Sequence, residues 1–190
     1  SFRWAWSRTR GRERNRVVKV NLIMAGSGGQ GIQFAGQVLA LAAVRQGLQA
    51  TYNPSYGAER RGGTSFCSVV IADGPIYDPV FERPTVVLAL DQRGRRQYAG
   101  QLGEEGLLLV NADLAPQAAD RERADVVGVP ASTLAERVCE NGALNLVMLG
   151  TYLALSNAVD VETVADVCRE KSRKKPHLIC LSYTSDAGDE

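Results

Sequence analysis

The sequence VVKVNLIMAGSGGQG, residues 17–31, decides how the rest of the chain is interpreted. Its first half is an almost continuous run of apolar residues, which is typical of a strand buried on both faces of a sheet. Its second half fits the pattern G-x-G-x-x-G, and an apolar helical pattern follows over residues 30–46. A buried strand, a glycine turn and a helix in this order predict the first unit of an α/β domain whose turn binds an anion.

Strand and helix patterns alternate along the rest of the chain. Gly47 is placed to end the first helix, and Ser132 and Asp160 are placed to cap two later ones. Residues 53–63 are rich in turn formers and are expected to form a loop. The further strand patterns cover residues 48–52, 64–73, 85–90, 107–111 and 124–129, and the helical ones 94–102, 132–139, 143–156 and 161–170. We therefore expect an α/β fold with a mostly parallel, Rossmann-like sheet in three layers, helices covering both faces.

The two ends of the chain differ from its middle. Residues 1–16 alternate arginine with polar residues after two tryptophans, and they have no periodicity that would bury a face. Residues 171–190 begin with a basic cluster and then lose any helical or strand pattern. We expect one domain over residues 17–170, with residues 1–16 as a disordered or non-native basic extension and residues 171–190 as a basic tail that is irregular or non-native.

The composition excludes several classes of protein. With 45% hydrophobic and 23% charged residues and a formal net charge of +1, the 190-residue chain is typical of a globular domain and not of a nucleic-acid-binding protein. No apolar run is long enough for a membrane span. The four cysteines lie far apart, which predicts neither a metal site nor a disulfide framework. A cytoplasmic protein fits these features best.

The glycine turn is the first candidate site. Its glycines would allow a tight turn, the approach of a phosphate to the backbone and close packing of the following helix, whose amides and dipole favour an anion. A dinucleotide fold also needs an acidic residue about 20 positions later, and residues 49–52 (QATY) contain none. No Gly-Lys-Ser/Thr follows either, so the turn is not a Walker loop. The residues expected to contact the anion are Gly26, Ser27, Gly28, Gly29, Gln30 and Gly31.

The second candidate site is the segment SYGAERRGGT, residues 55–64. Arginines held between glycines can bind phosphate or carboxylate in bidentate fashion, and the segment follows a strand at the edge where open α/β sheets bind ligands. We assign Glu59, Arg60 and Arg61 to this site. From residue types alone, a flexible solvated loop is the stronger interpretation. Asp91 is read as a helix cap, Cys67 as a core residue and the tyrosines as packing or interface residues.

Four segments together resemble the gamma subunit of 2-oxoacid:ferredoxin oxidoreductases. They are MAGSGGQGI (24–32), SYGAERRGGT (55–64), VVIADGPI (69–76) and VLALDQ (87–92), and residues 145–155 also resemble the family's C-terminal helix. The combination of Gly-Gly-Gln-Gly with Tyr-Gly-x-Glu-x-Arg-Gly-Gly is specific to that family. The resemblance covers nearly the whole expected domain.

The resemblance implies one subunit of an enzyme that decarboxylates a 2-oxoacid of the 2-oxoglutarate or pyruvate type. Such an enzyme uses coenzyme A and yields an acyl-CoA, carbon dioxide and reduced ferredoxin. Thiamine diphosphate would lie mainly between alpha and beta subunits, and 4Fe–4S clusters on beta or delta partners. This chain would then be inactive alone, contacting coenzyme A through residues 26–31 and closing the active site or the alpha-subunit contact through residues 59–61.

Three alternatives stay open. The chain resembles the beta subunit of indolepyruvate oxidoreductase, which shares this domain. A stand-alone, Rossmann-like nucleotide-binding module would explain the glycine turn without catalysis. An independent NAD- or flavin-dependent oxidoreductase is disfavoured by the missing ribose-binding acid. A hydrolase with a Ser-His-Asp or Cys-His constellation is excluded, because the only histidine, His177, lies in the irregular tail.

Overall fold

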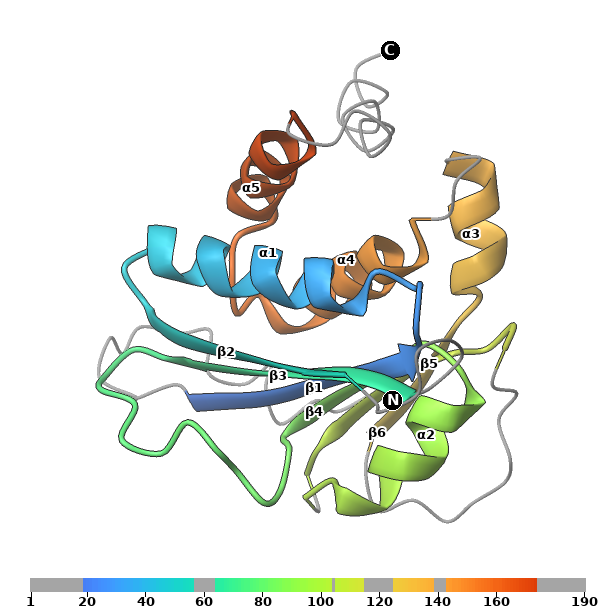
Figure 1. The fold of residues 1–190 in the computed structure, drawn as a ribbon, viewed down its shortest axis with the longest axis horizontal. Coiled ribbons are helices and arrows are strands. Elements are labelled where there is room, and N and C mark those ends of the chain that lie inside the picture. Colours follow the sequence, from blue (N-terminus) through green and yellow to red (C-terminus); the bar gives the residue numbers. More distant parts are fainter. Residues whose placement is uncertain (1–18, 57–63, 104, 115–124, 139–142, 174–190) are drawn as a thin grey trace.

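The computed structural model describes residues 19–56, 64–103, 105–114, 125–138 and 143–173. They form a six-stranded sheet in the order β2-β3-β1-β4-β5-β6, with helices on both faces (Figure 1). The strands are β1 (Lys19–Ser27), β2 (Gln49–Tyr56), β3 (Thr64–Ala72), β4 (Val86–Ala89), β5 (Leu107–Asn111) and β6 (Asp125–Val129). The helices are α1 (Ile32–Arg45), α2 (Gln92–Tyr98), η2 (Ala99–Gln101), α3 (Ala131–Val138), α4 (Leu144–Ser156) and α5 (Val161–Arg173). This confirms the expected α/β class.

The sheet is mostly parallel. β1, β4, β5 and β6 pair in parallel, whereas β3 lies antiparallel between β1 and β2. β1 is central, as its continuous apolar sequence predicted. Because β3 is antiparallel to both neighbours, β2 runs in the same direction as β1. The carboxyl ends of β1, β2, β4 and β5 therefore meet at one edge of the sheet.

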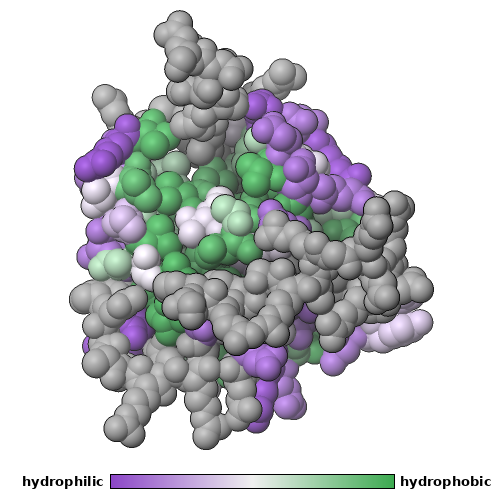
Figure 2. Space-filling view, turned by 180° about the vertical axis from the view of Figure 1, so that it is seen from behind, coloured by the Kyte–Doolittle hydropathy of each residue, from purple (hydrophilic) through white to green (hydrophobic). Residues whose placement is uncertain are grey.

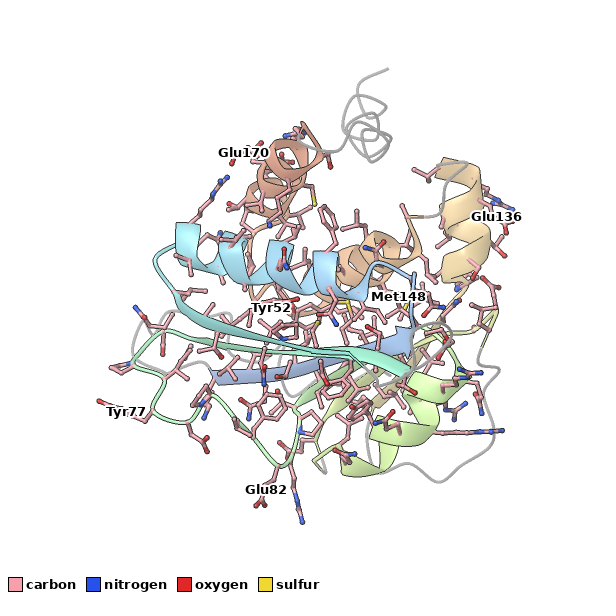
Figure 3. All side chains as sticks on the ribbon, in the orientation of Figure 1. Tyr52, Tyr77, Glu82, Glu136, Met148 and Glu170 are labelled. Carbon is pink, nitrogen blue, oxygen red and sulfur yellow. The ribbon has the colours of Figure 1, made fainter. Side chains whose placement is uncertain are left out.

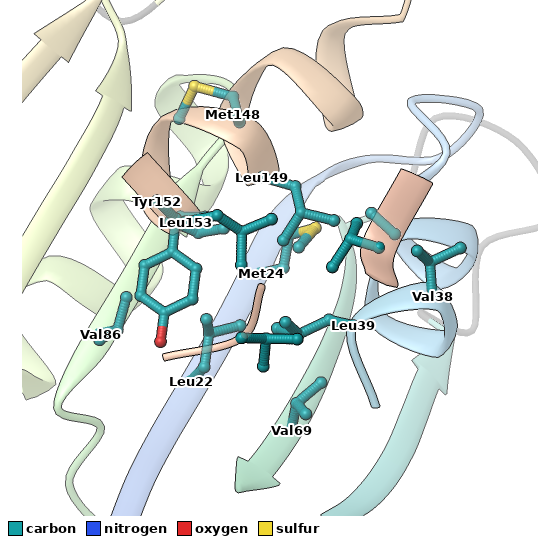
Figure 4. Packing of buried hydrophobic residues seen from close by; sticks show 14 of the residues in the cluster. Leu22, Met24, Val38, Leu39, Val69, Val86, Met148, Leu149, Tyr152 and Leu153 are labelled. Atoms are coloured by element: carbon teal, nitrogen blue, oxygen red, sulfur yellow. The ribbon is translucent and has the colours of Figure 1, made fainter. Parts of the chain in front are cut away.

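Alternate residues of β1 supply two cores. Leu22 and Met24 face α1 and α4, where the larger core contains Leu39, Leu149 and Tyr152 (Figure 4). Ile23 and Ala25 face the opposite side, where a smaller core forms against Tyr98 of α2. Burial on both faces explains why β1 shows no polar alternation. It also makes β1 the rigid support of the turn that follows it.

Helix α1 ends where the sequence predicted. Gly47 adopts a left-handed conformation (φ 81°), its amide bonds the carbonyl of Val44, and the amide of Leu48 bonds the carbonyl of Ala43. This pair of bonds is the Schellman motif, for which glycine is the favoured residue. Asp160 caps α5, as expected, by accepting from the amide of Thr163 at 3.1 Å.

Two local predictions were wrong. Residues 53–56 belong to β2 and not to a loop, and Pro54 is tolerated there because β2 is the edge strand and a missing N–H is least costly at an edge. Ser132 lies inside α3 and is not its N-cap. Side chains from the end of β5 serve that helix instead: Asn111 Oδ1 accepts from the amide of Ala131, and Asp113 Oδ2 from that of Thr133.

No helix in the described part of the chain is both long enough and apolar enough to cross a lipid bilayer. Seen from behind, apolar side chains gather in the middle of the described surface and hydrophilic ones surround them (Figure 2).

Candidate functional site

The glycine turn, residues 26–31, lies at the carboxyl edge of the sheet between β1 and α1. Gly29 and Gly31 have left-handed backbone angles, φ 95° and φ 73°, which favour glycine at both positions. Gly26 is buried, and a Cβ there would lie 2.2 Å from Oε1 of Gln30. The first glycine thus allows the tight turn that the pattern predicted.

The third glycine lies against a helix that is distant in sequence. A Cβ at Gly31 would lie 2.6 Å from Nδ2 of Asn145, at the start of α4, so glycine allows this helix to approach closely. Asn145 Nδ2 donates to the carbonyl of Gly31 at 2.9 Å. Asn145 is 114 residues away in sequence, and the only available signal was a polar residue at the start of an otherwise apolar helix.

Gln30 occupies part of the turn itself. Its Oε1 accepts from the amide of Ser27 at 2.9 Å. In this arrangement the amide of Ser27 is used within the turn and is not free to donate to an anion. Gln30 thus stabilises the turn through its side-chain carbonyl oxygen.

Three other amides of the turn stay available, whereas that of Gln30 donates to the carbonyl of Ser27 at 3.4 Å. Gly28 and Gly29 are exposed, and within the described residues the amides of Gly28, Gly29 and Gly31 donate to no protein acceptor. Gly31 is the N-cap of α1 and supplies no side-chain cap, and the first turn of the helix has no acidic residue. Unpaired amides at the positive end of a helix dipole attract a phosphate or carboxylate.

Ser27 and Asp91 join the turns after β1 and β4. The hydroxyl of Ser27 donates to Asp91 Oδ2 at 2.5 Å. Because a serine hydroxyl has a single hydrogen, Ser27 offers a bound anion no donor in this arrangement. The other carboxylate oxygen, Oδ1, accepts at 3.0 Å from each of the amides of Arg93 and Gly94. This confirms Asp91 as the N-cap of α2.

Asn111 extends this polar edge to β5. Its Nδ2 donates to the carbonyl of Leu90 at 3.1 Å and to Oγ of Ser132 at 3.0 Å. The side chain is buried, so these bonds hold the ends of β4 and β5 in a fixed relation. Sequence reasoning did not single out Asn111, although a polar residue that ends a buried strand was a usable signal.

Glu59, Arg60 and Arg61 lie outside the described residues. The residues that flank their segment are described: β2 ends at Tyr56 and β3 begins at Thr64, which pairs with Ser27 of β1. Both flanks therefore lie at the same edge of the sheet as the glycine turn, as expected for a segment that follows the second strand.

Cys67 lies under the first turn of α1. Its Sγ is 3.6 Å from the carbonyl oxygen of Ile32, and the side chain is fully buried. Burial raises the pKa of the Cys67 thiol to about 12. A thiol that stays protonated is no nucleophile at neutral pH, so the assignment of Cys67 to the core is confirmed. Within the described residues, no three His, Cys, Asp or Glu side chains are grouped so that they could hold a metal ion.

Comparison with known proteins gives a consistent result. The profile of the family described as pyruvate ferredoxin/flavodoxin oxidoreductase matches residues 21–182. The chain is 34% identical over 174 residues to the 2-oxoglutarate synthase subunit KorC of Methanocaldococcus jannaschii, covering 88% of this chain and 92% of that protein. It is 36% identical over 165 residues to the ketoisovalerate oxidoreductase subunit VorA of Methanothermobacter marburgensis. That match covers 86% of this chain but only 34% of VorA, so the chain spans about a third of the relative's length.

A solved structure with the same fold is similar over nearly its whole length. It is the gamma subunit of a keto/oxoacid ferredoxin oxidoreductase from Geobacter sulfurreducens, with a TM-score of 0.72 and 29% sequence identity. The alignment covers 86% of this chain and 92% of that one.

Proposed function

The chain belongs to the pyruvate ferredoxin/flavodoxin oxidoreductase family, and from this premise we propose that it is the gamma subunit of a 2-oxoacid:ferredoxin oxidoreductase. The complex would cleave carbon dioxide from a 2-oxoacid, transfer the acyl group to the thiol of coenzyme A and pass the released electron pair to ferredoxin. Its 2-oxoacid would be of the 2-oxoglutarate or pyruvate type. We propose that the complex works in the cytoplasm.

The division of labour within the complex is part of this proposal. Thiamine diphosphate, held mainly between alpha and beta subunits, would stabilise the carbanion left when carbon dioxide departs. Iron–sulfur clusters on beta or delta partners would carry the electrons. Cys67 and Cys168 are both buried, and burial raises the pKa of both thiols, so neither is an activated nucleophile. The chain is expected to be inactive alone.

The role proposed for this chain is to bind a phosphate of coenzyme A. One observation carries it: α1 starts without a side-chain cap, behind exposed glycines whose amides have no acceptor among the described residues. Phosphate would accept from the amides of Gly28, Gly29 and Gly31, while Gln30 and Ser27 hold the turn in shape. The pantetheine thiol would then extend from this anchor toward the partner subunits.

A substitution at Gly28 tests the phosphate site. Gly28→Val places a branched side chain at an exposed position of the turn and should raise the KM for coenzyme A about tenfold or more, roughly 1.4 kcal/mol, with little change in the KM for the 2-oxoacid. The matched control is Gly74→Val, because a Cβ at Gly74 meets nothing within 4 Å and the residue lies beyond the opposite edge of the sheet. An unchanged KM in a correctly assembled complex would remove the phosphate site.

The arginine segment is proposed to serve the same complex. From the family pattern, Glu59, Arg60 and Arg61 would close the active site or seal the contact with the alpha subunit. Arginine suits either role because its guanidinium can bind carboxylate or phosphate in bidentate fashion. Arg61→Ala should weaken assembly or turnover, measured by co-purification and by 2-oxoacid-dependent dye reduction. Normal values of both would exclude the segment from the mechanism.

Two exposed side chains give further support to the proposed assembly with partner chains. Tyr77 is 90% exposed and Val80 is 68% exposed, both in the segment between β3 and β4 (Tyr77 is labelled in Figure 3). Large exposed side chains of this kind are common at protein interfaces. Co-expression with alpha and beta candidates distinguishes the proposal from a stand-alone module. A chain that purifies alone with a bound nucleotide or flavin would favour the alternative.

A further inference from the structure

Gln33, in the first turn of α1, contacts both strands of the β2–β3 hairpin. Its Nε2 lies 2.9 Å from the carbonyl oxygen of Phe66 and 3.1 Å from that of Ser55, and its two hydrogens are donated to these carbonyls. Oγ of Ser65 lies 3.2 Å from the same nitrogen. Ser55 and Phe66 pair directly across the two strands. One side-chain amide thus joins α1 to a single rung of the hairpin.

The position of this rung gives the contact its importance. It lies next to Tyr56, where the described part of β2 ends, and Phe66 also pairs with Ala25 of β1, the residue just before the glycine turn. Gln33 is two residues beyond Gly31, the last residue of that turn. The side chain therefore connects the two structural parts that flank the proposed phosphate site.

The orientation of the Gln33 amide is determined by its partners. The carbonyls of Ser55 and Phe66 only accept, so the NH2 group must face them. On its other side, Gln33 Oε1 accepts from the hydroxyl of Tyr52 at 2.7 Å. Tyr52 lies between α1 and the sheet (Figure 3), so it holds the amide from the side opposite the rung.

A second layer of polar contacts extends from Tyr52 to the last described helix. The Nε2 of Gln37 lies 3.5 Å from the Tyr52 hydroxyl, and Lys171 of α5 donates to Gln37 Oε1 at 3.0 Å. These groups are partly buried, where an unmet hydrogen bond costs more than at the surface. The Gln33 amide is thus fixed directly by partners on β2 and β3, and Gln37 of α1 and Lys171 of α5 extend the network.

We propose that Gln33 is a positioning residue for the hairpin stem, that is, the end of β2 and the start of β3. It holds the stem in register with the glycine turn, so that ligand binding at the turn also stabilises the stem. The residue itself contacts no reacting atom. The ligand part of this assignment rests on the proposed function, whereas the positioning part does not. A side chain that only filled space would need neither the NH2 group nor its orientation.

Hydrogen–deuterium exchange of the assembled complex tests the positioning part. Gln33→Met keeps the size but removes both polar groups, and Gln33→Glu faces a carboxylate toward two carbonyl oxygens. Both variants should exchange about tenfold faster in peptides covering Gln49–Tyr56 and the start of Thr64–Ala72, with no change in Leu107–Asn111. Gln97→Met is the matched control, since Gln97 donates its Nε2 to Tyr98 on the far helix α2. Unchanged exchange in the stem of both variants would overturn the proposal.

The pH dependence of Gln33→Glu separates hydrogen bonding from packing. Facing carbonyl oxygens should raise the pKa of the introduced carboxyl, and its protonated form can donate one hydrogen to the stem. The excess exchange of Gln33→Glu over wild type should therefore shrink as the pH falls from about 8 to about 5, across the range expected for a raised glutamate pKa, whereas that of Gln33→Met should not. Equal pH profiles for the two variants would reduce Gln33 to a packing residue.

Adding coenzyme A distinguishes failure of this proposal from failure of the proposed function. In wild type, the ligand should slow exchange in residues 22–34 and in the stem; in Gln33→Met it should slow only residues 22–34. Protection of the stem that persists in Gln33→Met would overturn the coupling. If coenzyme A protects residues 22–34 in neither protein, the phosphate site fails and so does the coupling, while the ligand-free exchange still decides the positioning role.

Discussion

The turns after β1 and β4 are neighbours at one edge of the sheet, but the chain completes the two helix starts differently. Helix α2 begins behind Asp91, whose carboxylate accepts from the amides of Arg93 and Gly94. Helix α1 begins behind Gly31, which has no side chain to accept from the amides that follow. The start of α2 contains its own anion, the carboxylate of Asp91. The start of α1 offers only backbone amides, which favour the binding of an external anion.

The difference favours a structural role for the turn after β4 and the proposed phosphate-binding role for the turn after β1. A capped helix start gains stability from its own chain, and Asp91 also holds Ser27 through the hydroxyl. The turn before α1 is supported by this bond from Asp91 but has no carboxylate of its own. Within the turn, the side chain of Gln30 accepts only from the amide of Ser27. The turn after β4 therefore supports the turn after β1. Substitutions in the two turns should separate this structural role from anion binding.

The largest effect is expected where α2 touches β1. A Cβ at Gly94 would lie 2.5 Å from the carbonyl oxygen of Ala25 and 3.0 Å from the amide nitrogen of Gly26. Because backbone cannot move aside cheaply, Gly94→Ala should lower the free energy of unfolding by roughly 3 kcal/mol. Gly100→Ala, at a glycine with nothing within 4 Å, is the control for urea denaturation. Equal stability of the two variants would show that α2 does not press on the β1 turn.

Removing the internal anion comes next. Asp91→Ala takes the cap from α2 and the hydrogen-bond acceptor from Ser27, and it should cost about 2 kcal/mol of unfolding free energy. Asp91→Asn keeps a good capping side chain and should recover most of the loss. Thermal and urea unfolding of the two variants would measure this, and a loss of equal size in Asp91→Asn would contradict the capping role.

Giving α1 an anion of its own would make the start of α1 resemble that of α2. In Gln30→Glu, a carboxylate oxygen can still accept from the Ser27 amide, so stability should change by less than about 1 kcal/mol. The negative charge would repel a phosphate, and the KM for coenzyme A should rise about tenfold, roughly 1.4 kcal/mol. Normal affinity in this variant would mean that no anion binds beside Gln30.

The smallest effect concerns the thiol beneath α1. The pKa of Cys67 rises from its ordinary value of 9.0 to about 12 because the side chain is buried, so the folded state favours the protonated thiol. Its contribution to stability is complete below about pH 9 and is lost as the pH rises toward 12. Below pH 9, a thiol reagent should therefore label Cys67 only after unfolding. Fast labelling of the folded chain, mapped by mass spectrometry, would contradict this.

Much of the fold could be predicted because it is encoded locally. Continuous apolar runs specify the buried strands β1, β4 and β5, and Gly47 and Asp160 mark helix ends through their own conformation or side chain. The start of α3 was misjudged because its caps come from Asn111 and Asp113, some 20 residues earlier. Contacts of this kind leave no periodic signal in the sequence.

The candidate site was predictable in its location and less so in its detail. The glycine pattern correctly indicated a tight turn between strand and helix, whereas the use of the Ser27 amide by Gln30 depends on a side-chain orientation. Asn145 and Gln33 were not identified, because each contacts a segment that is brought close only by the tertiary fold. For Glu59, Arg60 and Arg61, the contribution to ligand binding stays a prediction.

The antiparallel insertion of β3 has a consequence for synthesis on the ribosome. β1 emerges first, yet its two neighbours are β3, which pairs Ser27 with Thr64 and Lys19 with Ala72, and β4, which begins at Val86. Until those segments have been translated, a strongly apolar strand has both edges unpaired, a state prone to association with other chains. Slowing translation between residues 27 and 64 should therefore increase aggregation of the nascent chain and its dependence on chaperones.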